Sequence, residues 1–137
     1  MNVVITKKDL DKIEGCLGKI VSSSFANSVL LIDRSGQLIA QQGNTPDVDL
    51  LSLSALTAAN FGATAEIAKL LGEEEFTLLF HKGRSENVYF SAVGEHTLLV
   101  TLFDDKTSLG LIRLKMNQRI DELASIVSSI FEKGKKS

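Results

Sequence analysis

The chain has 137 residues and a mass of 14.9 kDa, the size of one domain. Hydrophobic residues make up 44% and charged residues 23%, a composition typical of folded proteins rather than disordered ones. The net charge of -2 shows no basic excess, which argues against a nucleic-acid partner. The lone Cys16 cannot form an internal disulfide, and the mixed, polar first residues predict no cleavable signal. We therefore expect one cytoplasmic domain over residues 1–137, with an ordered core at about residues 7–131.

Hydrophobic spacing, turn residues and capping residues predict the secondary structure. The apolar run at residues 29–32 has the length of a strand that is buried on both faces, and Asp33 to Gly36 is typical turn chemistry. The expected elements are a helix at 7–24, strands at 28–33 and 37–42, a helix from Asp47 or Asp49 to Leu71, strands at 76–82, 87–93 and 97–103, and a helix from Thr107 or Ser108 to residue 131.

This order of elements predicts an α/β fold with three layers. Short connections favour antiparallel neighbours, and a single five-stranded, mostly antiparallel sheet needs cover on both faces. The order α-β-β-α-β-β-β-α therefore predicts an α/β/α sandwich. We expect the two terminal helices on one face of the sheet and the middle helix on the other.

No combination of residues in the sequence predicts catalysis. A phosphate-binding Gly-rich loop and a nucleophile elbow are both missing. His81 and His96 have no acidic or thiol residue at metal-ligand spacing, and Cys16 lies near the apolar stripe of the first helix, as a core residue would. Residues 73–75 are three glutamates, which form either a solvated charge run or a cation site, and the former is favoured. We expect no enzyme activity, no cofactor and no metal site.

The middle helix carries no charged residue between Asp49 and Glu66. One stripe has the spacing to pack on the sheet: Leu53, Leu56, Ala63, Ile67, Leu70 and Leu71. The opposite stripe consists of small or apolar residues where a solvated face would be charged: Leu51, Ala55, Ala58, Ala59, Gly62 and Ala65. Small residues three and four apart allow a partner to approach closely, so we expect an intermolecular surface. The alternatives are a helix buried within the monomer, or alanines chosen for helix propensity alone. The stretch is too short and too polar to span a membrane.

The strand after this helix lacks the usual protection of an exposed strand. Its body is Phe76, Thr77, Leu78, Leu79 and Phe80, with neither charge nor proline. If this strand lies at the sheet edge, a second copy of the chain can pair with it. A two-fold axis at that edge would bring two middle helices side by side, so these five residues are the expected homodimer interface.

Three segments carry a resemblance to a known family: LIDRSGQLIA at residues 31–40, LTAANFGATAEIAKLLGE at residues 56–73, and the stretch from Phe80 through VYFSAVG to TSLGLIRL at residues 107–114. In order and spacing they resemble the Roadblock/dynein-light-chain family, and its bacterial MglB-type members most closely. The resemblance runs from about Lys7 to Phe131.

The resemblance implies a homodimer without catalytic activity of its own, joined through its third strand and middle helix. It implies that the paired middle helices bind a small Ras-like polarity GTPase of the MglA type and accelerate GTP hydrolysis. An adaptor that binds a GTPase without affecting hydrolysis is the alternative, and enrichment at a cell pole is compatible with both. The helix positions that match are Ala55, Ala58, Ala59, Gly62, Ala63, Ala65 and Glu66. Glu66 departs from the pattern, since a small residue is expected there.

Many activating proteins insert an arginine into the GTPase site. The candidates are Arg34, Arg84, Arg113 and Arg119, none of which is on the small-residue helix. We expect these arginines to be solvated surface residues. The favoured mechanism is that the helix surface orders the switch residues of the GTPase itself. A small-ligand sensor would need convergent polar groups in a pocket, and the sequence shows no such cluster.

Overall fold

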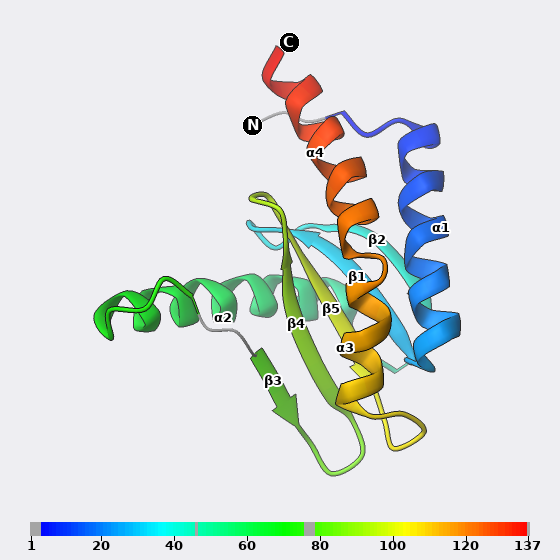
Figure 1. Ribbon diagram of the computed structural model, residues 1–137, viewed down its shortest axis with the longest axis vertical. Coiled ribbons are helices and arrows are strands. Elements are labelled where there is room, and N and C mark those ends of the chain that lie inside the picture. The colour runs from blue at the N-terminus through cyan, green and yellow to red at the C-terminus, as the bar shows by residue number, and fades with distance from the viewer. Residues whose placement is uncertain (1–3, 46, 76–78, 137) are drawn as a thin grey trace.

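A computed structural model describes residues 4–45, 47–75 and 79–136 of the chain (Figure 1). The elements are α1 (Lys7–Ser24), β1 (Ser28–Asp33), β2 (Leu38–Gly43), α2 (Leu50–Leu70), β3 (Leu79–Lys82), β4 (Asn87–Val93), β5 (Thr97–Phe103), α3 (Leu109–Asn117) and α4 (Ile120–Lys136).

The strands form one five-stranded sheet in the order β2-β1-β5-β4-β3, and every neighbouring pair is antiparallel. The strand β1 lies between β2 and β5, so that Leu31 is opposite Ala40 on one side and Leu99 on the other. The strand β5 is central and buried at every residue. The strand β3 is at the edge, as the argument for pairing with a second copy requires.

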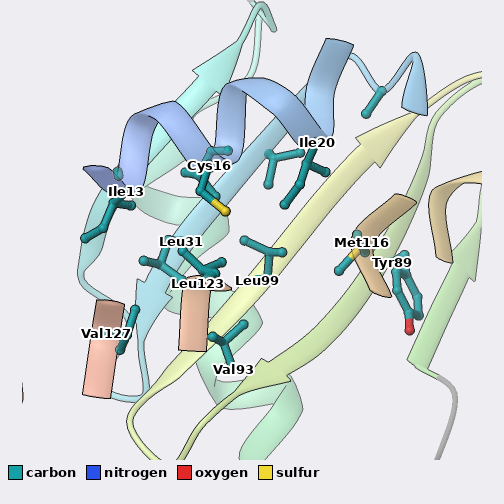
Figure 2. Close-up of a cluster of buried hydrophobic side chains, with 14 of the residues drawn as sticks. Ile13, Cys16, Ile20, Leu31, Tyr89, Val93, Leu99, Met116, Leu123 and Val127 are labelled. Carbon is teal, nitrogen blue, oxygen red and sulfur yellow. The ribbon is translucent and has the colours of Figure 1, made fainter. Parts of the chain in front are cut away.

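Two apolar cores cover the two faces of the sheet, which confirms the three-layer arrangement. The face toward α1, α3 and α4 holds Ile13, Leu31, Leu99 and Leu123, and Figure 2 shows these side chains converging. The face toward α2 holds Leu30 and its neighbours on β4 and β5. Adjacent strand residues alternate between faces, and all of residues 28–32 are buried, so the apolar run predicted as a doubly covered strand is confirmed.

Hydrogen bonds from side chains decide where the helices begin. The Asp49 carboxylate accepts a hydrogen bond from the Ser52 amide at 3.1 Å, so Asp49, rather than Asp47, caps α2. Ser108 caps α3 in the same way through the Leu111 amide at 3.2 Å. At its other end α2 ends at Leu70, and Gly72 follows with a φ of 79°, a conformation that favours glycine.

The last helix of the sequence prediction is broken in two, which corrects that prediction. The α3 helix ends at Asn117 and α4 begins at Ile120. The Arg119 amide donates to the Met116 carbonyl at 2.9 Å, a tighter connection than an α-helical turn makes. Met116 and Leu123, on either side of the break, are both fully buried. The apolar spacing therefore continues across the break, which is why the sequence pattern alone does not reveal it.

Candidate functional site

The exposed surface of α2 carries several large apolar side chains. Leu51, Leu56 and Leu70 are 72%, 69% and 86% exposed, and Ile67 is half exposed. Small residues separate these large ones. We define the α2 outer face as Leu51, Ala55, Leu56, Ala59, Gly62, Ala63, Ile67 and Leu70, all of them exposed. Exposed apolar surface of this extent is typical of an interaction site.

The opposite side of α2 packs on the sheet, and it is not the stripe that the sequence predicts. Leu50, Leu53, Ala58 and Phe61 contact the second core, and the buried residues of α2 are Ser54, Thr57 and Ala68. Of the predicted sheet-packing stripe only Leu53 faces inward, so that prediction is wrong. The Ser54 hydroxyl donates a hydrogen bond to the Leu50 carbonyl at 2.7 Å. This polar side chain can therefore be buried without losing a hydrogen-bond partner.

The seven predicted binding positions divide between the two sides of α2. Ala55, Ala59, Gly62, Ala63 and Glu66 are exposed. A methyl group added at Gly62 would meet nothing within 4 Å, so the backbone there is open to an approaching partner. Ala58 and Ala65 are half-buried: Ala58 packs on the second core, and Ala65 lines a small pocket with Phe61 and Leu79.

Glu66 lies on the exposed side, where it pairs with another residue of α2. Its carboxylate lies 3.3 Å from the Lys69 ammonium, and both side chains are about 70% exposed. A pair so exposed contributes little to stability. Glu66 is therefore available for a polar contact with a partner.

The predicted dimer interface is described only in part. Phe76, Thr77 and Leu78 lie outside the described residues. Leu79 and Phe80 are half-buried on the edge strand β3, where they pair with Phe90 and Tyr89 of β4. Leu79 packs against the second core and Phe80 against the first, its ring 5.9 Å from that of Phe103. Among the strands that the structure describes, none pairs with the outer side of β3.

Arg34 in the β1–β2 turn contacts α2, which the sequence does not reveal. Its Nε atom donates to the Glu95 carbonyl at 2.6 Å, and Nη2 donates to the Gly94 carbonyl at 3.4 Å. Its guanidinium also lies over the Phe61 ring, 5.2 Å from the ring centre. The side chain is exposed, as expected, but it is held at three points rather than free in solvent. The partners are far from Arg34 along the chain, so no local pattern signals the contact.

The other arginines lie away from α2. Arg84, between β3 and β4, and Arg113, on α3, are exposed. Arg119 lies at the break between α3 and α4, 3.5 Å from the Glu122 carboxylate. These positions are compatible with the solvated surface role expected of them.

The remaining candidate residues are in apolar or aromatic surroundings. Cys16 is 2% exposed in the first core, which confirms its expected place. Burial, and after it the negative charge of Glu122, raises the pKa of the thiol. His81 contacts the Phe90 ring edge-on at 5.1 Å, and His96 stacks on Phe131 at 4.6 Å. Over residues 4–45, 47–75 and 79–136, no group of three or more His, Cys, Asp or Glu is placed to hold a metal ion.

Within the same described part of the chain, no helix is both long enough and apolar enough to cross a membrane.

Comparison with known proteins agrees with this geometry. MglB of Myxococcus xanthus is 42% identical in sequence, with a TM-score of 0.81 over 86% of this chain and 96% of that chain. The gliding protein MglB of Thermus thermophilus is 31% identical, with a TM-score of 0.86 over 93% of this chain and 97% of that one. An MglB with a tetrameric arrangement is also 31% identical, with a TM-score of 0.87 over 94% and 97% of the two chains.

The Roadblock/LC7 domain matches residues 12–103, a range that extends from α1 to the end of β5. This range holds the whole sheet and the α2 outer face. The chain belongs to the Roadblock/LC7 family and is MglB-like in sequence and fold.

Proposed function

We propose that the protein is a GTPase-activating regulator of a bacterial Ras-like GTPase of the MglA type, which acts in cell polarity or motility. The observation that carries this proposal is the exposed, largely apolar α2 outer face, with Leu51, Leu56 and Leu70 all largely in solvent. The 42% identity to an MglB supports the choice of GTPase class. The regulator works as a homodimer in the cytoplasm, with enrichment at a cell pole as a further expectation.

The edge strand supports the homodimer. A second copy that pairs with β3 would continue the sheet across a two-fold axis, and Leu79 and Phe80 lie on that edge. The C-terminal part of α2 extends past the sheet on this side (Figure 1). The axis would therefore bring the exposed Leu70 close to its counterpart in the second copy. Two α2 helices then form one composite surface.

The small residues of the α2 outer face support a role in ordering a partner. Ala59, Gly62 and Ala63 leave the helix backbone accessible, so a partner segment can pack at close distance. A segment held in this way loses conformational freedom. If that segment is a switch region of the GTPase, its residues are held in the arrangement that hydrolysis needs. No arginine belongs to the face, so the proposal requires no donated side chain.

Single-turnover hydrolysis of GTP by the MglA-type GTPase of the same organism tests the proposal. The rate is measured with and without this protein at micromolar concentration, and binding is measured separately. We expect a rise of about tenfold or more, which corresponds to ~1.4 kcal/mol off the barrier. Binding without a change in rate would assign the adaptor function instead, and no binding would reject both.

A further inference from the structure

We propose that Arg34 is a positioning residue: from the β1–β2 turn it fixes the orientation of α2 and thereby of the α2 outer face. The effect on a GTPase rests on the function proposed above, whereas the effect on α2 itself does not. The proposal follows from the contacts of the turn, from the way its anchor is held, and from the unusual chemistry of α2.

The first step is the three-point engagement of the guanidinium. Arg34 donates to the carbonyls of Glu95 and Gly94 in the β4–β5 turn while its planar group covers the Phe61 ring of α2. A guanidinium can donate in its plane and contact a ring with its face at the same time. A lysine ammonium offers the charge but not this planar arrangement.

The second step is that the anchor of Arg34 is itself fixed. The Arg34 amide donates to the His96 carbonyl at 3.2 Å, which ties the two turns together. The ring of His96 stacks on Phe131 of α4, with 4.6 Å between the ring centres and 4° between the planes. The β4–β5 turn is therefore held from the opposite layer of the fold. Arg34 therefore links Phe61 to a turn that is held by contacts of its own.

The third step is a second contact between the same turn and α2. Gly36 has a φ of 98°, and a methyl group built on it would come within 2.9 Å of the Ala55 Cα. The Asp33 carboxylate accepts hydrogen bonds from the amides of Ser35 and Gln37 at 3.0 and 2.9 Å, which makes the turn stiff. Contacts at Ala55 and Phe61 are about 9 Å apart along the helix axis. Two contacts at that spacing define the direction of α2 as well as its position.

The fourth step is that burial alone orients α2 poorly. Its inner side combines Leu53 and Phe61 with the polar Ser54 and Thr57, while its outer side includes Leu56, Ile67 and Leu70. A rotation of the helix about its axis would replace one set of apolar side chains on the buried side with another, so the hydrophobic effect gives little preference for the observed orientation. The contacts of the β1–β2 turn supply that preference.

The test compares Arg34→Gln and Arg34→Lys with Arg113→Gln, which removes an exposed arginine from the other layer. Hydrogen exchange of the amides of residues 51–61 is measured in each variant, with the amides of α1 as an internal reference. We expect about two- to fivefold faster exchange in Arg34→Gln, the change that corresponds to losing one exposed cation–π contact, and a smaller change in Arg34→Lys. Arg113→Gln should leave the α2 amides unchanged.

The same variants are titrated in the single-turnover assay. If the productive orientation of α2 is populated only to a fraction f in a variant, the concentration for half-maximal stimulation rises by 1/f while the saturating rate stays unchanged. Arg34→Lys, which keeps the charge but not the planar group, should restore the half-maximal concentration only in part. Loss of the saturating rate itself would overturn the proposal and assign Arg34 as a donated arginine, since removing such a group lowers the rate by about 10³-fold or more.

The two proposals fail in different ways. Unchanged exchange at residues 51–61 in Arg34→Gln overturns the positioning role, whatever the GTPase does. If exchange changes as expected but the wild-type protein stimulates no hydrolysis, Arg34 still positions α2 and only the proposed activation is rejected.

Discussion

The guanidinium of Arg34 lies 5.2 Å from the centre of the Phe61 ring, and this contact joins the β1–β2 turn to α2. The pair links the segment at residues 31–40 to the segment at residues 56–73, two of the segments on which the family resemblance rests. Two of the segments that carry the resemblance are therefore in contact in the folded chain. One segment presents a surface, and the other holds that surface in place.

An arginine on the α2 outer face should block a partner without unfolding the protein. Ala59→Arg and Gly62→Arg place a long charged side chain at exposed positions, where the fold has room for it. We expect both variants to keep the far-ultraviolet circular dichroism of the wild-type protein and the proposed dimer but to lose GTPase binding. Gln118→Arg, an exposed substitution beside the α3–α4 break, is the control and should bind normally. Normal binding by either folded α2 variant would contradict the proposed site.

Two helical glycines form a matched pair. A methyl group added at Gly62 of α2 or Gly15 of α1 meets nothing within 4 Å, so alanine fits at both sites. Each Gly→Ala change should raise the free energy of unfolding by about 0.5–1 kcal/mol, measured by urea denaturation. Only Gly62→Ala should also weaken GTPase binding, because its methyl group would occupy the space where a partner backbone packs. Equal binding by the two variants would show that close approach at Gly62 is not needed.

A second pair of glycines isolates the contact between the β1–β2 turn and α2. Gly36 and Gly72 both have positive φ, 98° and 79°, so alanine is strained at each. At Gly72 the added methyl group is unobstructed, whereas at Gly36 it meets the Ala55 Cα at 2.9 Å. Gly72→Ala should lower the free energy of unfolding by about 1 kcal/mol, and Gly36→Ala by about 2 kcal/mol or more. Equal losses in thermal or urea denaturation would mean that the turn moves freely relative to α2.

The buried thiol predicts a loss of stability in alkali. The pKa of Cys16 is raised above its ordinary value of 9.0 because burial, and then Glu122, disfavours the thiolate. Above that value the unfolded chain releases the thiol proton while the folded chain retains it, so unfolding becomes more favourable as the pH rises. The stabilisation is complete below pH 9 and is lost as the pH rises through the folded pKa.

Comparison with Cys16→Ala checks this prediction. The alanine variant lacks the titrating thiol, so above about pH 9 its free energy of unfolding should fall less steeply with pH than that of the wild-type protein. Alkylation of the wild-type thiol by iodoacetamide should also be slow until the protein unfolds, because Cys16 is 2% exposed. Parallel pH profiles of the two proteins would contradict a raised pKa.

The sequence was sufficient for the layers and for most of the elements because those depend on local periodicity. The apolar run of β1 and the turn at residues 33–36 predict the first hairpin correctly. The break between α3 and α4 escapes prediction because Met116 and Leu123 keep the spacing of one continuous helix. The break changes the backbone hydrogen bonds but not the spacing of the apolar residues, so the hydrophobic pattern of the sequence does not reveal it.

The sequence predicts that the candidate site lies on α2, but it does not predict which side of that helix is exposed. That α2 carries an unusual uncharged surface is evident from the sequence, whereas the inner and outer sides were assigned wrongly for Leu56, Ile67 and Leu70. When apolar residues lie on every side of a helix, the hydrophobic spacing does not distinguish its buried side from its exposed side. The Ser54 hydroxyl donates locally to the Leu50 carbonyl, but the packing that buries Ser54 and Thr57 is a tertiary effect. The contact of Arg34 with Phe61 is likewise tertiary.

The position of β5 in the sheet has a consequence for how the chain folds during synthesis. This strand lies between β1 and β4 and is buried at every residue, yet it begins only at Thr97 of the 137 residues. Until residues 97–103 leave the ribosome, the first hairpin has one unpaired side at β1, and α2 has no complete sheet beneath it. We expect the nascent chain to acquire stable structure in a single late step, when β5 pairs with both β1 and β4. Until that step, chaperones that recognise apolar segments have access to α2.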